Sequence, residues 1–149
     1  MSDSAIIPCP SCSSLNRIPA ARMDEAPRCG DCKAEVLPGA PFDLDQGNFA
    51  SQLKGDLPLL VDVWAAWCGP CRSFAPTFSQ AAGELRTRCR LGKLDSEANQ
   101  QLAAQLRAEG GSLLATTSRR TPPALVGALR SAFADVPHVI WGDGGVRRE

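Results

Sequence analysis

The sequence predicts an α/β domain with a parallel sheet, preceded by a small metal-binding segment. An apolar run of strand length at 59–64 is followed by helical and strand-like segments in alternation, an order typical of a parallel sheet covered by helices. Four of the seven cysteines lie in the first 40 residues. We expect residues 1–40 to form a zinc ribbon and linker, 41–134 the α/β domain and 135–149 a loose tail.

Composition and charge exclude several classes of protein. The 149 residues are 44% hydrophobic and carry 16 acidic and 16 basic side chains, which suits one domain with an appendage. A balanced charge gives no electrostatic reason to expect nucleic acid or membrane as a partner. No apolar run approaches the roughly 18 residues of a spanning helix, and the N-terminus does not resemble a secretory signal. We therefore expect a cytoplasmic protein.

The first elements of the α/β domain lie around the apolar run. Asp45 is a candidate cap for a short helix that carries Phe49 and Leu53. Leu59–Trp64 is expected to be a strand buried on both faces, as in parallel sheets. A turn then leads into a helix that should reach about Leu85.

Further elements follow with the same alternation. Pro76 is expected to kink the long helix. Arg90–Leu94 fits a second strand, and Ala98, Leu102 and Leu106 recur at the four-residue spacing of a helix.

The pattern weakens after Leu106. Ser112–Thr117 fits one strand, and Thr121 begins a helix whose apolar face contains Leu125, Val126, Leu129 and Phe133. The stretch between Leu106 and this helix is too short for two strands. We expect segment 107–121 to be irregular and the sheet to be incomplete at its C-terminal hairpin.

The strongest chemical signal is Trp67-Cys68-Gly69-Pro70-Cys71, directly after the predicted strand. A cysteine at a helix start has its thiolate stabilised by unpaired N–H groups and the helix dipole, and the thiolate is the nucleophile in disulfide exchange. Cys71 lies close enough in sequence to attack a mixed disulfide on Cys68. Core cysteines or half of a metal site are the alternatives, but the strand–turn–helix setting favours a redox pair.

Asp62 interrupts the apolar strand six residues before Cys68. A buried carboxylate without a partner has a raised pKa and can accept the proton of Cys71 when that thiol attacks. The alternative is a buried hydrogen-bond acceptor without a catalytic role. Trp67 is expected to face the substrate, whereas the unpaired Cys89 is expected to be a half-buried packing residue.

A second cysteine set fits tetrahedral zinc. Cys9-Pro-Ser-Cys12 and Cys29-Gly-Asp-Cys32 are separated by sixteen residues, a spacing typical of four-thiolate zinc sites. Four protein ligands leave no open position, which predicts one structural zinc per chain. A redox-active or disulfide-linked set is the alternative. Removal of residues 1–40 is expected to leave the redox pair chemically competent.

These motifs resemble the thioredoxin family, and specifically its bacterial thioredoxin-2 type, which has an N-terminal zinc ribbon. The resemblance extends from about Cys9 to Leu106. Besides the cysteine motifs it includes Leu15-Asn16-Arg17-Ile18-Pro19, Val61-Asp62-Val63-Trp64, Pro76 and Lys93-Leu94-Asp95.

The resemblance implies a thioredoxin-like fold, in which helices flank a central sheet. It also implies that the protein reduces protein disulfides. It implies rereduction by a flavin- and NADPH-dependent thioredoxin reductase, and we expect a monomer. By the same resemblance Cys68 is the attacking sulfur, Cys71 the resolving sulfur and Asp62 the proton acceptor. The candidate substrate-binding residues are Trp67, Gly69 and Pro70.

The chain departs from the family after Leu106. Members of the family have Ile-Pro-Thr here, with a cis proline that faces the active site, whereas an ungapped count places Ser112 at the proline position. A local disturbance of the reading frame is one explanation. Two further alternatives therefore stay open: a catalytically impaired protein that acts as a zinc-ribbon interaction module, and a product that does not fold stably.

Overall fold

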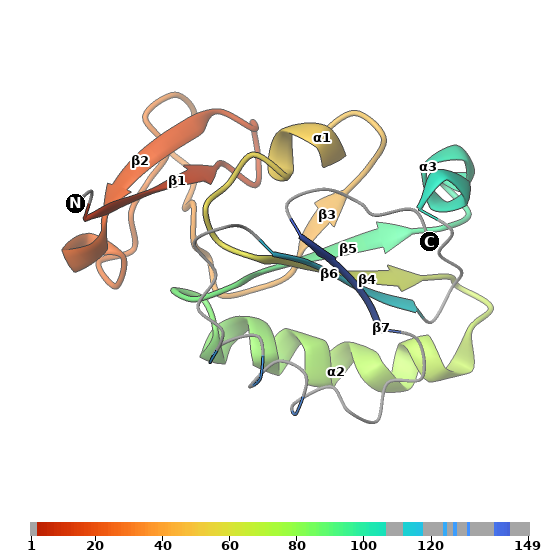
Figure 1. Cartoon of the computed structure of the whole chain (residues 1–149). Helices are drawn as coiled ribbons and strands as arrows, with labels where there is room; N and C mark the ends of the chain where they lie inside the picture. Colours follow the sequence, from red (N-terminus) through yellow and green to blue (C-terminus); the bar gives the residue numbers. More distant parts are fainter. Residues whose placement is uncertain are drawn as a thin grey trace.

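A mixed sheet forms the centre of the protein, and a two-stranded hairpin lies beside it (Figure 1). The computed structural model describes residues 3–106, 112–117 and 139–143, together with Ala124, Gly127 and Ser131. Within these ranges, no helix combines the length and the apolar character that crossing a membrane requires.

The strands and helices occupy the following ranges in chain order: β1 (Ser4–Pro8), β2 (Leu15–Pro19), β3 (Phe42–Leu44), α1 (Phe49–Gln52), β4 (Leu59–Trp64), α2 (Gly69–Glu84), β5 (Arg90–Asp95), α3 (Gln100–Gln105), β6 (Ser112–Thr117) and β7 (Val139–Asp143). The central sheet has the order β3-β5-β4-β6-β7. β3, β5 and β4 are parallel, β6 is antiparallel to β4, and β7 is parallel to β6.

Helices cover both faces of this sheet, with α2 on one face and α1 and α3 on the other (Figure 1). Side chains alternate along β4, so each face receives its own set. One apolar core contains Leu44, Phe49, Leu59, Val61, Val63, Leu94, Leu102, Leu106 and Leu114. The α2 face has a second core, which contains Leu60, Phe78, Ala82, Cys89, Leu91, Leu113 and Ala115. The alternation places Asp62 on the same face as Leu60, under α2.

Four elements of the α/β domain confirm the sequence prediction: β4, α2, β5 and α3. The cap of α1 differs, because the helix begins after Asn48 and no side chain caps it. Asp45 Oδ1 instead accepts the N–H groups of Gly47 and Asn48 at 2.7 and 2.8 Å. Asp45 therefore closes the turn before α1 rather than capping the helix itself.

The C-terminal part of the sheet is only partly as expected. β6 forms where one strand was predicted and pairs with β4. β7 lies in the region 135–149, so our expectation of a tail is wrong for Val139–Asp143. Parallel pairing requires a long connection between two strands, and residues 118–138 separate β6 from β7 in the sequence.

Parts of the C-terminal prediction lie outside the described residues, including segment 107–111 and the apolar face of the predicted last helix. Ala124, Gly127 and Ser131 are helical and exposed.

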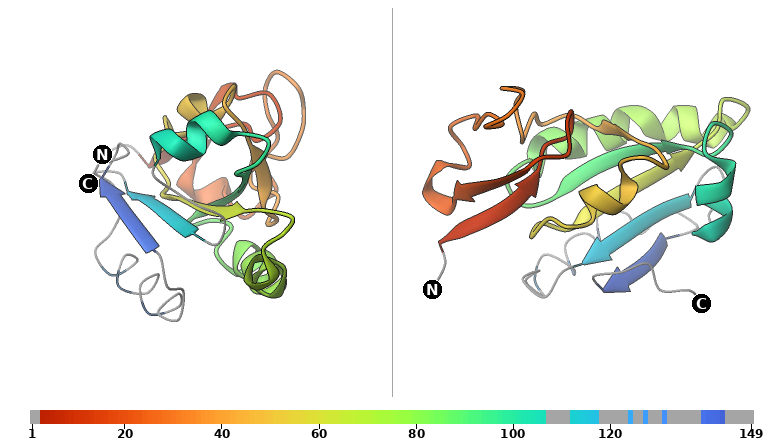
Figure 2. Two further views of the ribbon diagram at one scale, coloured as in Figure 1. Left: turned by 90° about the vertical axis from the view of Figure 1, so that its right-hand side faces the viewer. Right: turned by 90° about the horizontal axis from the view of Figure 1, so that it is seen from above.

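The hairpin of β1 and β2 belongs to the zinc ribbon and lies at the end of the sheet remote from α3 (Figure 1 and Figure 2). Its small core contains Ile7, Cys9, Ile18, Met23, Cys29, Val36 and Leu37. Leu37, near the end of the predicted ribbon-and-linker segment 1–40, is buried in this core. Leu57 of the α/β domain packs against the same core, because the ribbon has few apolar side chains of its own.

Candidate active site and metal centre

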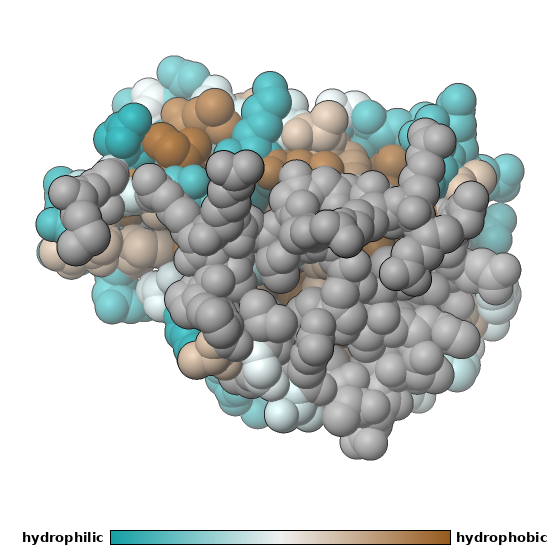
Figure 3. Space-filling view, in the orientation of Figure 1, coloured by the Kyte–Doolittle hydropathy of each residue, from teal (hydrophilic) through white to brown (hydrophobic). Residues whose placement is uncertain are grey.

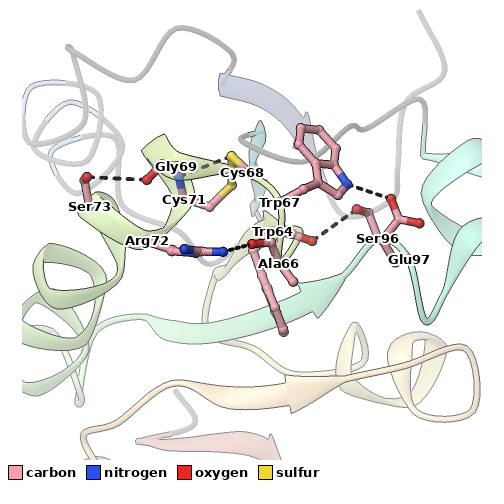
Figure 4. The surroundings of a disulfide bond; sticks show 10 residues. All are labelled: Trp64, Ala66, Trp67, Cys68, Gly69, Cys71, Arg72, Ser73, Ser96 and Glu97. Atoms are coloured by element: carbon pink, nitrogen blue, oxygen red, sulfur yellow. Dashed lines mark hydrogen bonds between the residues drawn. A yellow bond between two sulfur atoms is a disulfide. The ribbon is translucent and has the colours of Figure 1, made fainter.

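Cys68 lies immediately before the first residue of α2, in extended backbone geometry. Its Sγ accepts the N–H of Cys71 at 3.2 Å (Figure 4). A sulfur at this position is stabilised as a thiolate by the unpaired N–H groups and the positive end of the helix dipole. Pro70 fits the first turn of α2, because the N–H group that proline lacks would have no intrahelical acceptor at this position.

The two cysteines of the motif are joined in a disulfide, with their Cα atoms 5.3 Å apart. Cys68 is 6% exposed and Cys71 is 5% exposed, and both pack against Ala65 and the partly buried Trp64. The prediction that these two cysteines lie together at the start of a helix after a buried strand is confirmed.

Trp67 lies beside this disulfide and is 68% exposed. Its indole Nε1 donates a hydrogen bond to Glu97 Oε1 at 2.9 Å (Figure 4). Glu97 follows β5, and its own N–H is held by Asp95 Oδ1 at 2.9 Å. Sequence reasoning did not find Glu97, because nothing in the local pattern relates it to a residue thirty positions earlier.

Asp62 is 3% exposed, and its Oδ2 has no hydrogen-bond donor among the described residues. Burial raises the pKa of Asp62 to about 6, while the positive charge of Lys93 acts in the opposite direction. Lys93 is the direct neighbour of Asp62 in the pairing of β4 with β5.

A pocket connects this carboxylate with the redox pair. Its lining residues are Asp62, Trp64, Ala65, Ala66, Cys71, Arg72, Ala75 and Lys93. The volume is about 290 Å³, which is enough for several water molecules. Because Asp62 and Cys71 line the same pocket, a proton can pass between them through water.

Arg72 fixes the turn before α2. Its Nη2 donates to the carbonyl of Ala66, and Ser73 Oγ donates to the carbonyl of Gly69 at 3.4 Å (Figure 4).

The surface in Figure 3 is largely hydrophilic along its rim, with hydrophobic residues over the ribbon and near α1. Within the described part of the chain, the exposed large hydrophobic side chains are Leu15 and Trp67.

The metal centre is formed by two turns with the same backbone geometry. Ser13 and Lys33, the residues that follow the second cysteine of each motif, both have φ of 65°. The N–H of Ser13 donates to the carbonyl of Cys9 at 2.9 Å, and that of Lys33 to the carbonyl of Cys29 at 3.1 Å. The repeated turn directs both sulfur atoms of each motif toward the same point.

The four sulfur atoms of Cys9, Cys12, Cys29 and Cys32 all lie within 4.8 Å of one another. The Sγ atoms of Cys9 and Cys32 are 3.5 Å apart, and those of Cys12 and Cys29 are 3.6 Å apart. A tetrahedral zinc with bonds of about 2.3 Å requires sulfur atoms about 3.8 Å apart. The donor set therefore fits zinc, whereas disulfide pairing would bring two sulfurs to about 2.05 Å.

Asn16 joins the two turns of the metal centre. Its Nδ2 donates to the Ser14 carbonyl at 3.0 Å and to Cys29 Sγ at 3.6 Å, and its Oδ1 accepts the Gly30 N–H at 3.0 Å. Sequence reasoning quoted Asn16 as part of a motif but gave it no role.

Cys89 is 2% exposed in the core under α2, so the expectation that it is half-buried is wrong. Burial raises the pKa of its thiol to about 12, which keeps it protonated and unreactive.

Comparison with known proteins identifies the family. The thioredoxin family model matches residues 40–128, and the model "Thioredoxin 2, N-terminal" matches residues 8–34. The chain belongs to the thioredoxin family. "Thioredoxin C-3" of Corynebacterium nephridii is 38% identical over 128 residues, which are 85% of this chain and 88% of that protein. A thioredoxin of Alicyclobacillus acidocaldarius is 39% identical over 66 residues, 44% of this chain and 63% of that one.

Solved structures give the same result. The short form of spinach chloroplast thioredoxin f superposes with a TM-score of 0.53 at 25% identity, covering 66% of this chain and 97% of the spinach chain. The protein is thus a thioredoxin-type thiol–disulfide oxidoreductase that reduces protein disulfides, as predicted. These similarities do not favour the alternative of an inactive interaction module. The four-cysteine cluster and the match to the thioredoxin-2 N-terminal family also support metal binding.

Proposed function

We propose that Cys68 attacks the substrate disulfide, that Cys71 resolves the mixed disulfide and that Asp62 accepts the proton of Cys71. The position of Cys68 Sγ at the start of α2 carries this assignment, because it favours the thiolate on that sulfur. Cys71 lies in the first turn of α2 and lines the pocket that Asp62 also lines.

The reaction proceeds in two exchanges. The Cys68 thiolate bonds to one sulfur of the substrate disulfide, and the other substrate sulfur leaves as a thiolate. Cys71 then transfers its proton to Asp62, directly or through pocket water, and attacks Cys68 Sγ. The second substrate sulfur leaves, so the substrate gains two electrons and the enzyme ends with a Cys68–Cys71 disulfide.

Asp62 is suited to the second exchange because its pKa of about 6 lies close to neutral pH. The carboxylate is therefore mostly ionised at pH 7, yet it binds a proton more tightly than an exposed aspartate does. Lys93 supplies the nearby positive charge that keeps the buried carboxylate ionised.

Trp67, Gly69 and Pro70 are the proposed substrate contacts. The exposed indole of Trp67 offers an apolar surface next to the attacking sulfur. An added Cβ at Gly69 would meet no atom of the described residues within 4 Å, which leaves the backbone beside Cys68 open to an approaching polypeptide on this part of the surface.

We propose one zinc per chain, bound by Cys9, Cys12, Cys29 and Cys32. Four thiolates complete the coordination, so the metal supplies folding energy to the ribbon and takes no part in disulfide exchange.

The proposed redox partner is a flavin- and NADPH-dependent thioredoxin reductase. Support comes from the "Bifunctional thioredoxin reductase/thioredoxin" of Mycobacterium leprae, which is 41% identical over 61 residues, 41% of this chain and 13% of that protein. We further propose that the protein acts as a monomer in the cytoplasm on disulfide-bearing proteins.

Mixed-disulfide trapping tests the assigned order of the two sulfurs. Cys71→Ser is expected to accumulate substrate on Cys68, because the resolving thiol is absent, whereas Cys68→Ser is expected to trap none. Non-reducing gels with a disulfide-bonded protein substrate show the adduct. Equal trapping by the two variants would contradict the assignment.

A further inference from the structure

Arg90 is a buried charged residue that belongs to neither the redox site nor the metal centre. It begins β5 and is only 4% exposed. Its guanidinium carbon lies 4.8 Å from the centre of the Phe42 ring. A charged group in such a place destabilises the fold unless its donors are paired. The hydrogen-bond partners of Arg90 therefore indicate its role in the fold.

These partners come from both the ribbon and the α/β domain. Nη2 donates to the carbonyl of Pro8 at 3.0 Å and to Gln52 Oε1. Nη1 donates to the backbone carbonyl of Gln52 at 3.3 Å. Pro8 is the last residue of β1 and directly precedes the metal-ligand candidate Cys9. One guanidinium thus connects the ribbon strand to α1.

Gln52 extends the same connection to the first cysteine turn. Its side chain is 1% exposed, and its Nε2 donates to the Cys9 carbonyl at 2.8 Å and to Ser13 Oγ at 3.2 Å. The side-chain amide of Gln52 therefore accepts a hydrogen bond from Arg90 and donates hydrogen bonds to the ribbon. A buried amide is stable only when both its ends are paired in this way.

The residues that follow Gln52 also contact the ribbon. Asp56 Oδ2 accepts the Ile6 N–H at 2.7 Å, and the Asp56 N–H donates to the Ile6 carbonyl at 2.9 Å. A Cβ at Gly55 would lie 2.9 Å from Pro8 Cδ, so only glycine permits this approach of β1. Leu57 then enters the ribbon core.

We propose that Arg90 and Gln52 form a polar latch that docks the zinc ribbon on the redox domain, so that the two fold as one unit. This goes beyond disulfide reduction, whose proposed reacting residues lie on β4, on α2 and in the turn between them. It also changes what removal of residues 1–40 should do. The loss of the Pro8 and Cys9 carbonyls removes ribbon acceptors of Arg90 and Gln52, and the absence of the ribbon exposes Leu57 and the other apolar surface that the ribbon covers. The shortened chain should therefore be much less stable even though Cys68 keeps its local geometry.

The two intermodule amides, Ile6 and Asp56, report directly on docking. Hydrogen exchange of these amides is measured by NMR in the full-length protein purified with zinc. Arg90→Met keeps a long apolar stem but removes the donors, and it is expected to accelerate both exchange rates about tenfold or more. Arg88→Met is the matched control at an exposed arginine and should leave the rates unchanged.

A second variant tests the same contact in case Arg90→Met does not fold. Gln52→Ala removes the donor to Cys9 and the side-chain acceptor of Arg90 while leaving every residue of β5 unchanged, and it should also accelerate exchange at Asp56. Rates within about twofold of wild type in every variant that folds would overturn the proposal. Insulin reduction by the same samples reports on Cys68 separately, so failure of the latch and failure of the redox assignment are distinguishable.

Discussion

Lys93 lies directly opposite Asp62 in the parallel pairing of β5 with β4, and both side chains line the pocket that reaches Cys71. The Lys93 ammonium also lies 5.4 Å from the centre of the Trp64 ring, which holds it at the pocket wall. A buried carboxylate, a cation and the proposed resolving thiol therefore share one pocket, and we propose that the charge balance there governs the second exchange.

Asp62→Asn is predicted to stabilise the protein at neutral pH. The pKa of Asp62 is about 6 in the folded protein against an ordinary 3.8, so the folded state binds this proton more tightly than the unfolded state. Stability of the wild type should fall as pH rises between these two values and stay level above them. The amount by which the free energy of unfolding of Asp62→Asn exceeds that of the wild type should grow over the same pH range, to at most about 3 kcal/mol. Urea unfolding at pH 4 and pH 7.5 checks this, and an equal gain at both would contradict it.

Lys93→Met is predicted to raise the pKa of Asp62 further, because the opposing positive charge is lost while burial remains. The carboxyl carbon shift of Asp62, followed by NMR from pH 4 to pH 9, measures the midpoint. Lys54→Met, at an exposed lysine outside the pocket, is the control. A midpoint that does not move upward in Lys93→Met would show that Lys93 does not act on Asp62.

Asn16→Ala is predicted to weaken zinc retention. The amide of Asn16 holds the two cysteine turns together and donates to Cys29 Sγ, and loss of such an outer contact typically lowers metal affinity about 10- to 100-fold. The rate of zinc transfer to a chromogenic chelator measures the effect. Arg17→Ala changes the exposed neighbour and should release zinc at the wild-type rate. The same rate in both variants would contradict the role of Asn16.

Glu97→Ala is predicted to impair reduction of protein disulfides more than reduction of small disulfides. Without its acceptor the Trp67 indole is no longer fixed beside Cys68, so the surface offered to a polypeptide becomes less ordered. A several-fold rise in KM for a protein substrate is expected, with Glu97→Gln close to wild type because its amide oxygen still accepts. An unchanged KM in Glu97→Ala would rule out this positioning role.

The parts of the fold that the sequence predicted correctly depend on local signals. Leu59–Trp64 and α2 follow from an apolar run and a capped helix start, and the metal centre follows from cysteine spacing. Asp62 was found because a charge in a buried strand is conspicuous.

What the sequence did not predict depends on contacts between distant segments. β7 is placed only by its pairing with β6 across residues 118–138. Arg90 at the start of a strand has no local feature that distinguishes it from the exposed Arg88, and only the fold brings Pro8 and Gln52 to it. Glu97 is likewise defined by the position of Trp67.

Insulin reduction with dithiothreitol as electron donor tests most directly whether the Cys68–Cys71 pair makes this protein a protein-disulfide reductase. The wild type should accelerate precipitation of the insulin B chain well beyond dithiothreitol alone, and Cys68→Ser should reduce the rate to that background. Cys89→Ser, at the buried cysteine of the core, should retain activity if the variant folds. A wild-type rate equal to the background, or full activity in Cys68→Ser, would contradict the account.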